Sequence, residues 1–332
     1  MDVLITYIGD AGTSVTSLFG MAGKPMFILN NNIHTMPKED DWKGSIIKAF
    51  NAYASDNCMI TQGNKLYYSA NSDFQYQYCC DLSPYANGNY YAYPIQIDDK
   101  IYVCPQNAQD ILVIRNRILE KCIKLEYCME QAGAFRGAIK IGQYLFLIPF
   151  RYPGIVRYDV ISEKIDYIKG YNHIFGKMIE GQWKLGGYCA WKDCLLIASP
   201  DTNQIVVIQS KSLKVQIVTI SAKYASGYAV LVPDGMDIWL FSLFGKTIVK
   251  WNPETGYLKE FLNIPKRFVC KQRPYGYECE EHPFGWAIRY KEYIYISPAW
   301  GNMFLRLNKE TGEIKEWIPP IPLLKEEKNG YY

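Results

Sequence analysis

The sequence lacks the features that would assign it directly to a function class. Its 332 residues contain no block of like charges and its formal net charge is only +3, so the charge pattern indicates neither a nucleic-acid partner nor a membrane surface. No apolar run reaches the roughly 18 to 20 residues that span a bilayer. The P-loop, nucleophile-elbow and EF-hand consensus sequences are also absent. We therefore predict no cofactor and no membrane span.

The sequence also lacks a small-domain disulfide framework, although it contains ten cysteines. A chain of this length can bury a large core without covalent staples, and its first residues do not have the pattern of a secretory signal peptide. Disulfides persist mainly in oxidising compartments. Because most of the cysteines fall inside predicted strands, we expect a reduced, cytoplasmic protein. These strand cysteines are Cys79, Cys80, Cys104, Cys122, Cys189 and Cys194.

What the sequence does contain is a repeated pattern of strands, clearest in residues 137–168. This stretch has four short runs rich in Ile, Val, Tyr and Phe, namely GAIKIG, YLFLIPF, GIVRYDV and KIDYI. Branched and aromatic side chains favour a pleated strand, and the separators are too short for helices. The runs should therefore pair as an antiparallel meander. One meander cannot bury both of its faces, whereas copies packed face to face around an axis can.

Copies of this unit recur along the chain. Runs equivalent to its second strand occupy residues 65–68, 100–103, 144–147, 194–197, 237–240 and 293–296, and third strands follow at 111–114, 155–158, 205–208, 247–251 and 303–307. Four copies place a proline at one equivalent point: Pro105, Pro149, Pro200 and Pro298. Their spacing is near the roughly 40 to 50 residues of a four-stranded blade.

We therefore predict an all-β protein whose residues 54–320 form a six-bladed β-propeller of four-stranded antiparallel blades, followed by a tail at 321–332. The alternative is an irregular β-sandwich, in which strands would not share a proline position. The first copy, residues 57–82, shows no obvious fourth strand. Either that blade has three strands, or an N-terminal segment or the tail supplies its missing edge.

The first residues show a different pattern. Residues 3–8 and 26–29 are predicted strands, residues 15–22 have helical spacing, and residues 42–53 could form a connecting helix. Free backbone N–H groups at the start of the first helix, with the hydroxyls of Thr13 and Ser14, could hold a phosphate. The alternative is an ordinary N-capped helix.

Residues 2–29 resemble the last βαβ unit in the nucleotide-binding half of GT-B glycosyltransferases, particularly the CDP-glycerol glycerophosphotransferase group. The match is carried by Asp2–Thr6 (DVLIT), the pair Thr13 and Ser14, and Gly23–Pro25 (GKP). The resemblance implies that Thr13 and Ser14 contact the diphosphate of a nucleotide-activated donor. The turn over residues 7–14 is longer than in that family, and the rest of both transferase halves is missing. Residues 1–53 are thus predicted to be a remnant without transferase activity of their own.

Candidate ligand-binding residues lie on loops that propellers generally gather on one face, by analogy at the level of the fold. Aromatic planes stack on sugar rings, and Arg or Lys binds phosphate or carboxylate. The predicted ligand is therefore an anionic glycan or polyol phosphate. The alternative is that these long surface loops are simply polar. The candidates are Arg136, Arg151, Tyr152, Trp183, Lys184, Tyr224, Lys246, Arg273, Tyr275 and Trp300.

An enzymatic alternative rests on histidine, of which the chain has only three. His282 with Glu280, or His173, could supply the general acid and base of a lyase or hydrolase. Cys270, Cys279 and His282 approach a zinc-binding spacing but lack a fourth ligand, so no metal site is predicted.

The favoured hypothesis is a non-catalytic binding or scaffolding propeller. It would associate with a glycosyltransferase that makes a bacterial cell-surface polysaccharide or teichoic-acid-type polymer. A propeller enzyme and a protein-interaction propeller are the alternatives.

Overall fold

In the computed structural model, most of the described residues are in strands. The described residues are 2–6, 16–21, 24–29, 32–35, 52–56, 59–62, 64–68, 77–127, 133–169, 185–269, 283–298 and 303–317. Within these ranges the one α-helix is the short α1 (Ser83–Ala86), and no helix is long and apolar enough to cross a membrane. The prediction of an all-β chain is confirmed.

The strands of the described residues form seven antiparallel sheets of four consecutive strands each. The first three sheets are β1 (Asp2–Thr6), β2 (Thr16–Met21), β3 (Lys24–Leu29) and β4 (Asn32–Thr35); β5 (Ala52–Asp56), β6 (Met59–Gln62), β7 (Lys65–Tyr68) and β8 (Gln77–Asp81); and β9 (Tyr91–Ile97), β10 (Lys100–Pro105), β11 (Asp110–Arg115) and β12 (Ile118–Lys124).

The next two sheets are β13 (Phe135–Ile141), β14 (Tyr144–Pro149), β15 (Ile155–Asp159) and β16 (Ile165–Ile168); and β17 (Tyr188–Trp191), β18 (Cys194–Ala198), β19 (Gln204–Gln209) and β20 (Val215–Thr219). The last two are β21 (Ser226–Asp234), β22 (Asp237–Phe244), β23 (Ile248–Trp251) and β24 (Leu258–Phe261); and β25 (Phe284–Tyr290), β26 (Tyr293–Pro298), β27 (Phe304–Asn308) and β28 (Ile314–Trp317).

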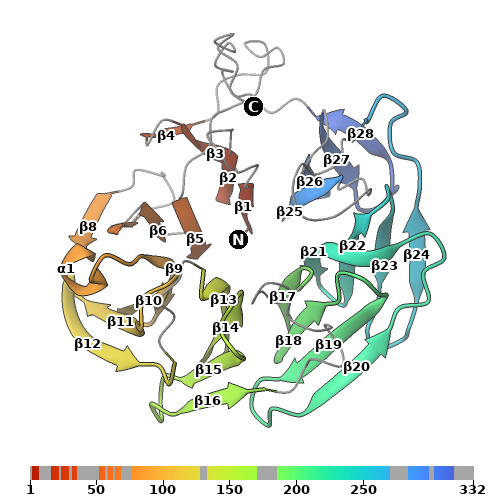
Figure 1. The fold of residues 1–332 in the computed structure, drawn as a ribbon. Helices are drawn as coiled ribbons and strands as arrows, with labels where there is room; N and C mark the ends of the chain where they lie inside the picture. Colours follow the sequence, from red (N-terminus) through yellow and green to blue (C-terminus); the bar gives the residue numbers. More distant parts are fainter. Residues whose placement is uncertain are drawn as a thin grey trace.

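The sheets stand around a central axis as the blades of a β-propeller, with the first strand of each blade innermost (Figure 1). Innermost strands of successive blades contact one another from β5 through β25, and β1 contacts both β25 and β5. The ring thus contains seven blades rather than the six predicted, and blade β1–β4 closes it. From blade β5–β8 through blade β25–β28, buried apolar side chains pack between successive blades.

The extra blade corrects three predictions about the N-terminal region. Residues 16–21 are strand β2, antiparallel to β1 and β3, and not a helix. As a strand, this segment satisfies its backbone groups through two neighbours, whereas one βαβ unit would leave a sheet face uncovered. Residues 52 and 53, expected at the end of a connecting helix, belong to β5. Residues 65–68, taken as a second strand, form the third strand β7, so blade β5–β8 is complete.

The middle strands of the blades carry most of the core. In β14, Leu145 to Ile148 are fully buried, because the second strand of a blade has paired neighbours on both edges and packed blades on both faces. Outermost strands are more exposed, and β12 alternates exposed with partly buried positions before Ile123. This contrast between middle and outermost strands matches the apolar runs on which the repeat was recognised.

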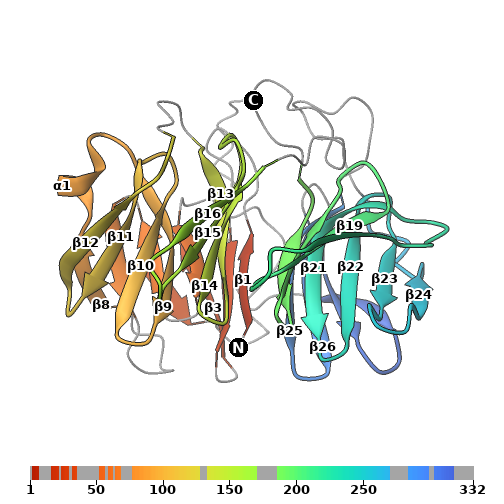
Figure 2. The ribbon, with the colours of Figure 1, turned by 90° about the horizontal axis from the view of Figure 1, so that it is seen from below.

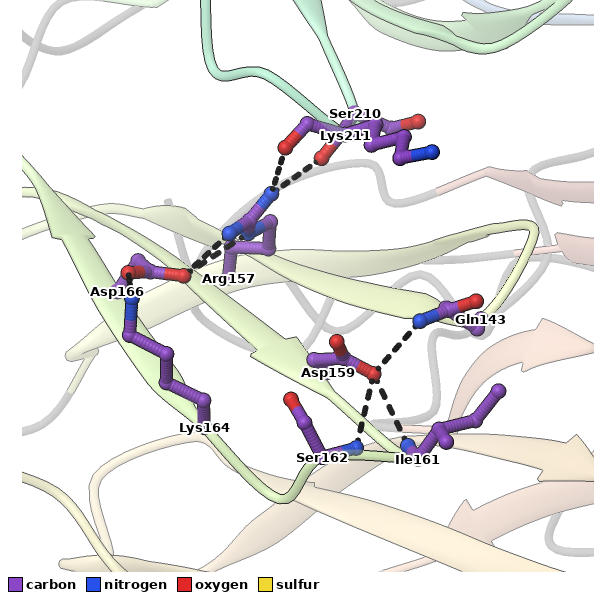
Figure 3. A network of polar contacts seen from close by, with 9 residues as sticks. All are labelled: Gln143, Arg157, Asp159, Ile161, Ser162, Lys164, Asp166, Ser210 and Lys211. Atoms are coloured by element: carbon purple, nitrogen blue, oxygen red, sulfur yellow. Dashed lines mark hydrogen bonds and ion pairs between the residues drawn. The ribbon is translucent and has the colours of Figure 1, made fainter.

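A buried arginine links two blades (Figure 3). Arg157 on β15 is only 8% exposed. Its guanidinium donates hydrogen bonds to Asp166 on β16 and to the carbonyl oxygens of Ser210 and Lys211 in the β19–β20 turn. A charge taken out of water needs such partners. The contact therefore holds blade β13–β16 against blade β17–β20.

The connections divide between two faces of the ring, seen from the side in Figure 2. We call the first face the end that carries loops between second and third strands and loops between blades, and the second face the end that carries the tight hairpin turns. Hydrogen bonds between neighbouring blades link loops that lie on the same face. The N–H of Tyr91 donates to Asn64 at the first face, and Trp191 Nε1 donates to the carbonyl of Gly235 at the second.

Candidate functional site

The innermost strands share an irregularity at their first-face end. In five blades, one residue of the first strand has no partner on the second strand, so the register shifts there, and in four of these blades the register identifies that residue. Such a β-bulge turns a side chain away from the regular alternation and often lies beside a functional site. The bulged residues are Tyr93, Arg136, Ala229 and Gly285.

Arg136 is the charged member of this set. It lies between buried Phe135 and buried Gly137 at the start of β13, and its own side chain is half-buried. Nη1 donates a hydrogen bond of 2.5 Å to the carbonyl oxygen of Leu185, which precedes the first strand of the next blade. Within the described part of the chain, this is its one recorded hydrogen bond. A guanidinium carries five N–H donors, so most of its donor capacity is available to a ligand.

Tyr188, the first residue of β17, lies beside Arg136. A Cβ atom at Gly137 would lie 1.7 Å from the Tyr188 hydroxyl oxygen, so the absence of a side chain at Gly137 is what makes room for the phenol. Burial raises the pKa of Tyr188, and the charge of Arg136 opposes this shift. The phenol is therefore protonated at neutral pH and can donate a hydrogen bond next to the guanidinium.

The structure places the other described candidates in two groups on the first face. Arg151 belongs to the same blade as Arg136, since its backbone N–H donates to the carbonyl of Ala134. Tyr224 and Lys246 both lie in first-face loops of blade β21–β24, where Thr247, the residue after Lys246, donates a hydrogen bond from Oγ1 to the carbonyl of Tyr224 at 2.8 Å. Tyr224 is 54% exposed. The two groups belong to different blades, β13–β16 and β21–β24.

Tyr152 does not present its ring to a ligand, contrary to the prediction. It is 1% exposed, and it stacks on Phe135 at 4.6 Å and on Tyr167 at 6.4 Å between ring centroids. Its hydroxyl accepts a hydrogen bond from the N–H of Tyr127. This aromatic cluster fills the space between two blades, which explains why an aromatic residue stands in that loop.

Several predicted site residues lie outside the described residues and receive no structural account. They are Thr13, Ser14, His173, Trp183, Lys184, Cys270, Arg273, Tyr275, Cys279, Glu280, His282 and Trp300. Among the residues that are described, no group of three His, Cys, Asp or Glu side chains could hold a metal ion.

A depression of about 540 Å³ lies on the second face, between blades β21–β24 and β25–β28. Asp234 at its centre accepts hydrogen bonds from Arg289 at 2.9 Å, Lys309 at 3.2 Å and Trp239 at 3.3 Å. Positive and negative side chains compensate one another here, so this network joins two blades rather than attracting a charged ligand. Its lining residues are Asp234, Lys250, Lys291, Glu292, Lys309 and Glu310.

The sequence argument missed Tyr188 and the Asp234 network. A glycine inside a strand can indicate close approach of another group, and Gly137 is such a residue. That signal could have pointed to a side chain packed beside Arg136. Nothing in the sequence near Asp234 pairs it with Arg289, because the two residues belong to different blades.

No family model matches the sequence, and no curated protein matches it. Among solved structures, the chain is similar to a catalytically inactive virginiamycin B lyase from Staphylococcus aureus with quinupristin, at 15% identity and a TM-score of 0.55 over 91% of this chain and 98% of that one. It is also similar to a chain of the mitotic checkpoint complex, at 11% identity and a TM-score of 0.52 over 89% and 90% of the two chains.

A third similar structure is the extracellular domain of a hybrid two-component system from B. thetaiotaomicron, at 10% identity and a TM-score of 0.56. The match covers 96% of this chain and 42% of that one, so the chain spans less than half of that protein's length. At these identities the likeness concerns the fold alone. The chain has the β-propeller fold.

Proposed function

We propose that this protein is a non-catalytic binding propeller that takes an anionic glycan or polyol phosphate on its first face, beside Arg136. The observation that carries the proposal is Arg136, a half-buried guanidinium at a β-bulge whose one recorded hydrogen bond goes to the Leu185 carbonyl. A guanidinium with unused donors, partly shielded from water, is suited to a phosphate or carboxylate group.

The surroundings of Arg136 support a polar, hydroxyl-bearing ligand. The protonated Tyr188 phenol lies beside the guanidinium and offers one more donor to a ligand oxygen. Exposed Tyr224 and the nearby Lys246 add an aromatic plane and a second cation farther along the same face. A polymer with repeating anionic groups could contact both parts of the face at once, which would raise its apparent affinity above that of one unit.

Association with a glycosyltransferase is not part of this proposal. The transferase resemblance lies in residues 2–29, and the described strands of that segment form a blade of the ring. A phosphate site at a helix start has no basis there, because residues 16–21 are a strand.

The test is a calorimetric titration of the full chain with a poly(glycerol phosphate) oligomer and with a neutral glycan of similar length. Wild type should bind the phosphate oligomer, more weakly at high salt. Arg136→Gln should weaken binding about tenfold or more, since a hydrogen bond to a charged group contributes about 1.5 to 3 kcal/mol. The affinity of Arg136→Lys should lie between those of the wild type and Arg136→Gln, because lysine keeps the positive charge but lacks the forked donor geometry of the guanidinium.

Lys214→Gln is the matched control, since Lys214 lies in an exposed hairpin turn of the second face. It should bind like wild type. The proposal would be refuted if the wild type bound neither oligomer. It would also be refuted if Arg136→Gln bound the phosphate oligomer with the same affinity as Lys214→Gln. Thermal unfolding of each variant confirms that the ring is intact.

A further inference from the structure

Cys79 and Cys80 are the only two of the ten cysteines that are adjacent in the sequence. Both are free cysteines on β8, the outermost strand of blade β5–β8. Successive side chains of a regular strand point to opposite faces of its sheet. On a regular strand these two thiols would be kept apart, so whether they can act together depends on the local backbone.

A β-bulge brings the two thiols to one face of the blade. On the neighbouring strand β7, Leu66 pairs with Cys80, and the next residue, Tyr67, pairs with Tyr78. Cys79 is thus an extra residue without a partner on β7, and such a residue interrupts the alternation of side chains. Both cysteines accordingly pack against the same apolar cluster between blades β5–β8 and β9–β12. They are neighbours on one side of the strand.

The two thiols also contact each other. The Cys80 thiol donates a hydrogen bond to the Cys79 sulfur, and this bond lowers the pKa of Cys79 and raises that of Cys80. Burial opposes the shift of Cys79, while the positive charge of Arg117 in the next blade supports it. By contrast, burial alone raises the pKa of Cys104. Cys79 therefore has the greater thiolate character, and the thiolate is the form that attacks an electrophile or binds a metal.

The pair lies at the outer rim of the ring. Cys79 is 7% exposed, whereas Cys80 is half-buried, and no further strand covers β8 within its sheet. A small molecule can therefore approach Cys80 first and then engage Cys79 beside it.

The geometry suits an atom held between two sulfurs better than a disulfide. The peptide bond between the two residues is trans, which sets their Cα atoms about 3.8 Å apart, whereas disulfides usually join Cα atoms about 4.4 to 6.8 Å apart. A closed zinc site needs four ligands, and in the described ranges no group of three His, Cys, Asp or Glu side chains could hold a metal ion. The fitting ligand is one that takes two sulfurs from the protein.

We infer that Cys79 and Cys80 form a binding site for a thiophilic ligand that bonds two sulfurs at once, of the class of trivalent organoarsenicals. With an arsenical R–As(OH)₂, two As–S bonds form and two As–O bonds break. The two thiol protons leave with the two hydroxyl groups as water, and the oxidation state of arsenic does not change. The second bond forms within the protein, so the chelate is much tighter than a bond to one thiol.

Phenylarsine oxide is the probe, added to the reduced full-length protein in its native state. Excess 2-mercaptoethanol then removes arsenic that is held by one thiol only, and mass spectrometry of the intact protein counts the arsenicals that remain. Cys79→Ser and Cys80→Ser should each retain one equivalent less than the wild type. Cys122→Ser is the matched control, because Cys122 is exposed on the outermost strand β12 and has no adjacent cysteine. It should retain as much as the wild type.

A second control tests the bulge itself. Lys121 and Cys122 pair in regular succession with β11, so their side chains point to opposite faces. Lys121→Cys, introduced into protein that also carries Cys79→Ser and Cys80→Ser, creates an adjacent pair on a regular stretch of strand. It should retain no more arsenical than the double variant alone.

Three results would overturn the inference. Cys79→Ser and Cys80→Ser could retain as much arsenical as the wild type, or Cys122→Ser could lose as much as they do. The pair made by Lys121→Cys could also retain one equivalent, which would show that adjacency in sequence, and not the bulge, suffices. Circular dichroism of each variant checks that the ring is folded. Arg136 lies on an innermost strand of another blade, so the result does not depend on the proposed glycan or phosphate site.

Discussion

Replacing Arg157 by methionine should lower the free energy of unfolding by about 3 kcal/mol, at the lower end of the cost of breaking a buried ion pair. Methionine keeps much of the side-chain volume but cannot donate to the Ser210 carbonyl at 2.5 Å or the Lys211 carbonyl at 2.8 Å. A polar group left unsatisfied costs about 1 to 3 kcal/mol. Asp166 keeps one ion-pair partner in the variant, because Lys164 Nζ lies 3.0 Å from its carboxylate, which is also 17% exposed.

The measurement is urea unfolding of the full chain, followed by both circular dichroism and tryptophan fluorescence so that coincident transitions justify a single free energy. Lys164→Met is the matched control, because Lys164 binds the same carboxylate but is 70% exposed. An exposed ion pair contributes about 1 kcal/mol or less. An Arg157→Met variant that unfolds with the wild type, or no earlier than Lys164→Met, would refute the reasoning.

The same variant should change how stability depends on pH. Burial of Asp166 works against its ionisation, but hydrogen bonds from Arg157 and Lys164 hold its pKa below the ordinary value. A lowered folded-state pKa contributes stability that is present above the unfolded pKa, about 3.9, and is lost as the pH falls through the folded value. The difference between wild type and Arg157→Met should therefore narrow below about pH 4. A constant difference at every pH would contradict this account.

Two further predictions concern the innermost strands and the second face. Gly137→Ala should destabilise the protein by about 1 to 3 kcal/mol through overpacking, because its Cβ would lie 1.7 Å from the Tyr188 hydroxyl oxygen. Thermal unfolding should show little additional loss when Gly137→Ala is added to Tyr188→Ala, and a full additional loss would exclude this contact as the cause. Asp234→Asn should cost about 1 to 3 kcal/mol at neutral pH. Burial opposes the ionisation of Asp234, yet hydrogen bonds led by that from Arg289 hold its pKa below the ordinary value. The melting temperatures of the variant and the wild type should therefore approach each other as the pH falls into the acid range. A difference in melting temperature that stays constant with pH would contradict this prediction.

The sequence predicted the blades best where apolar runs and turns alternate regularly. The third strands expected at residues 111–114, 155–158 and 205–208 coincide with β11, β15 and β19. Three of the shared prolines, Pro105, Pro149 and Pro298, end the second strands β10, β14 and β26. Local chemistry decides these elements, because each pairs with its immediate neighbour in sequence.

The N-terminal blade could not be predicted from local pattern. Residues 16–21, TSLFGM, are too short for the helical and the strand period to be distinguished, and the transferase resemblance favoured a helix. What decides the outcome is pairing with β1 and β3 and the place of the blade between β25 and β5. The contact between β1 and β25 joins segments from opposite parts of the chain, which a local sequence pattern does not encode.

We predicted Arg136 as a site residue from the position of its loop in a propeller, and we predicted an anionic ligand from the chemistry of the guanidinium. The β-bulge that sets Arg136 apart depends on the register between β13 and β14, and the sequence does not reveal that register. Tyr152 shows the opposite error. Its loop position suggested exposure, but the ring packs against Phe135 and Tyr167 because neighbouring blades leave an apolar gap that an aromatic residue fills.

The contact between β1 and β25 has a consequence for the order in which the native state assembles. Every blade is an uninterrupted stretch of chain, so each can form from contacts close in sequence, and local contacts of this kind form quickly. Closing the circle is different, since it must wait until the final blade exists and meets the first. We therefore expect the blades to form and pack in an open arrangement before the ring closes. We also expect the interface between β1 and β25 to be the first to open when the protein begins to unfold.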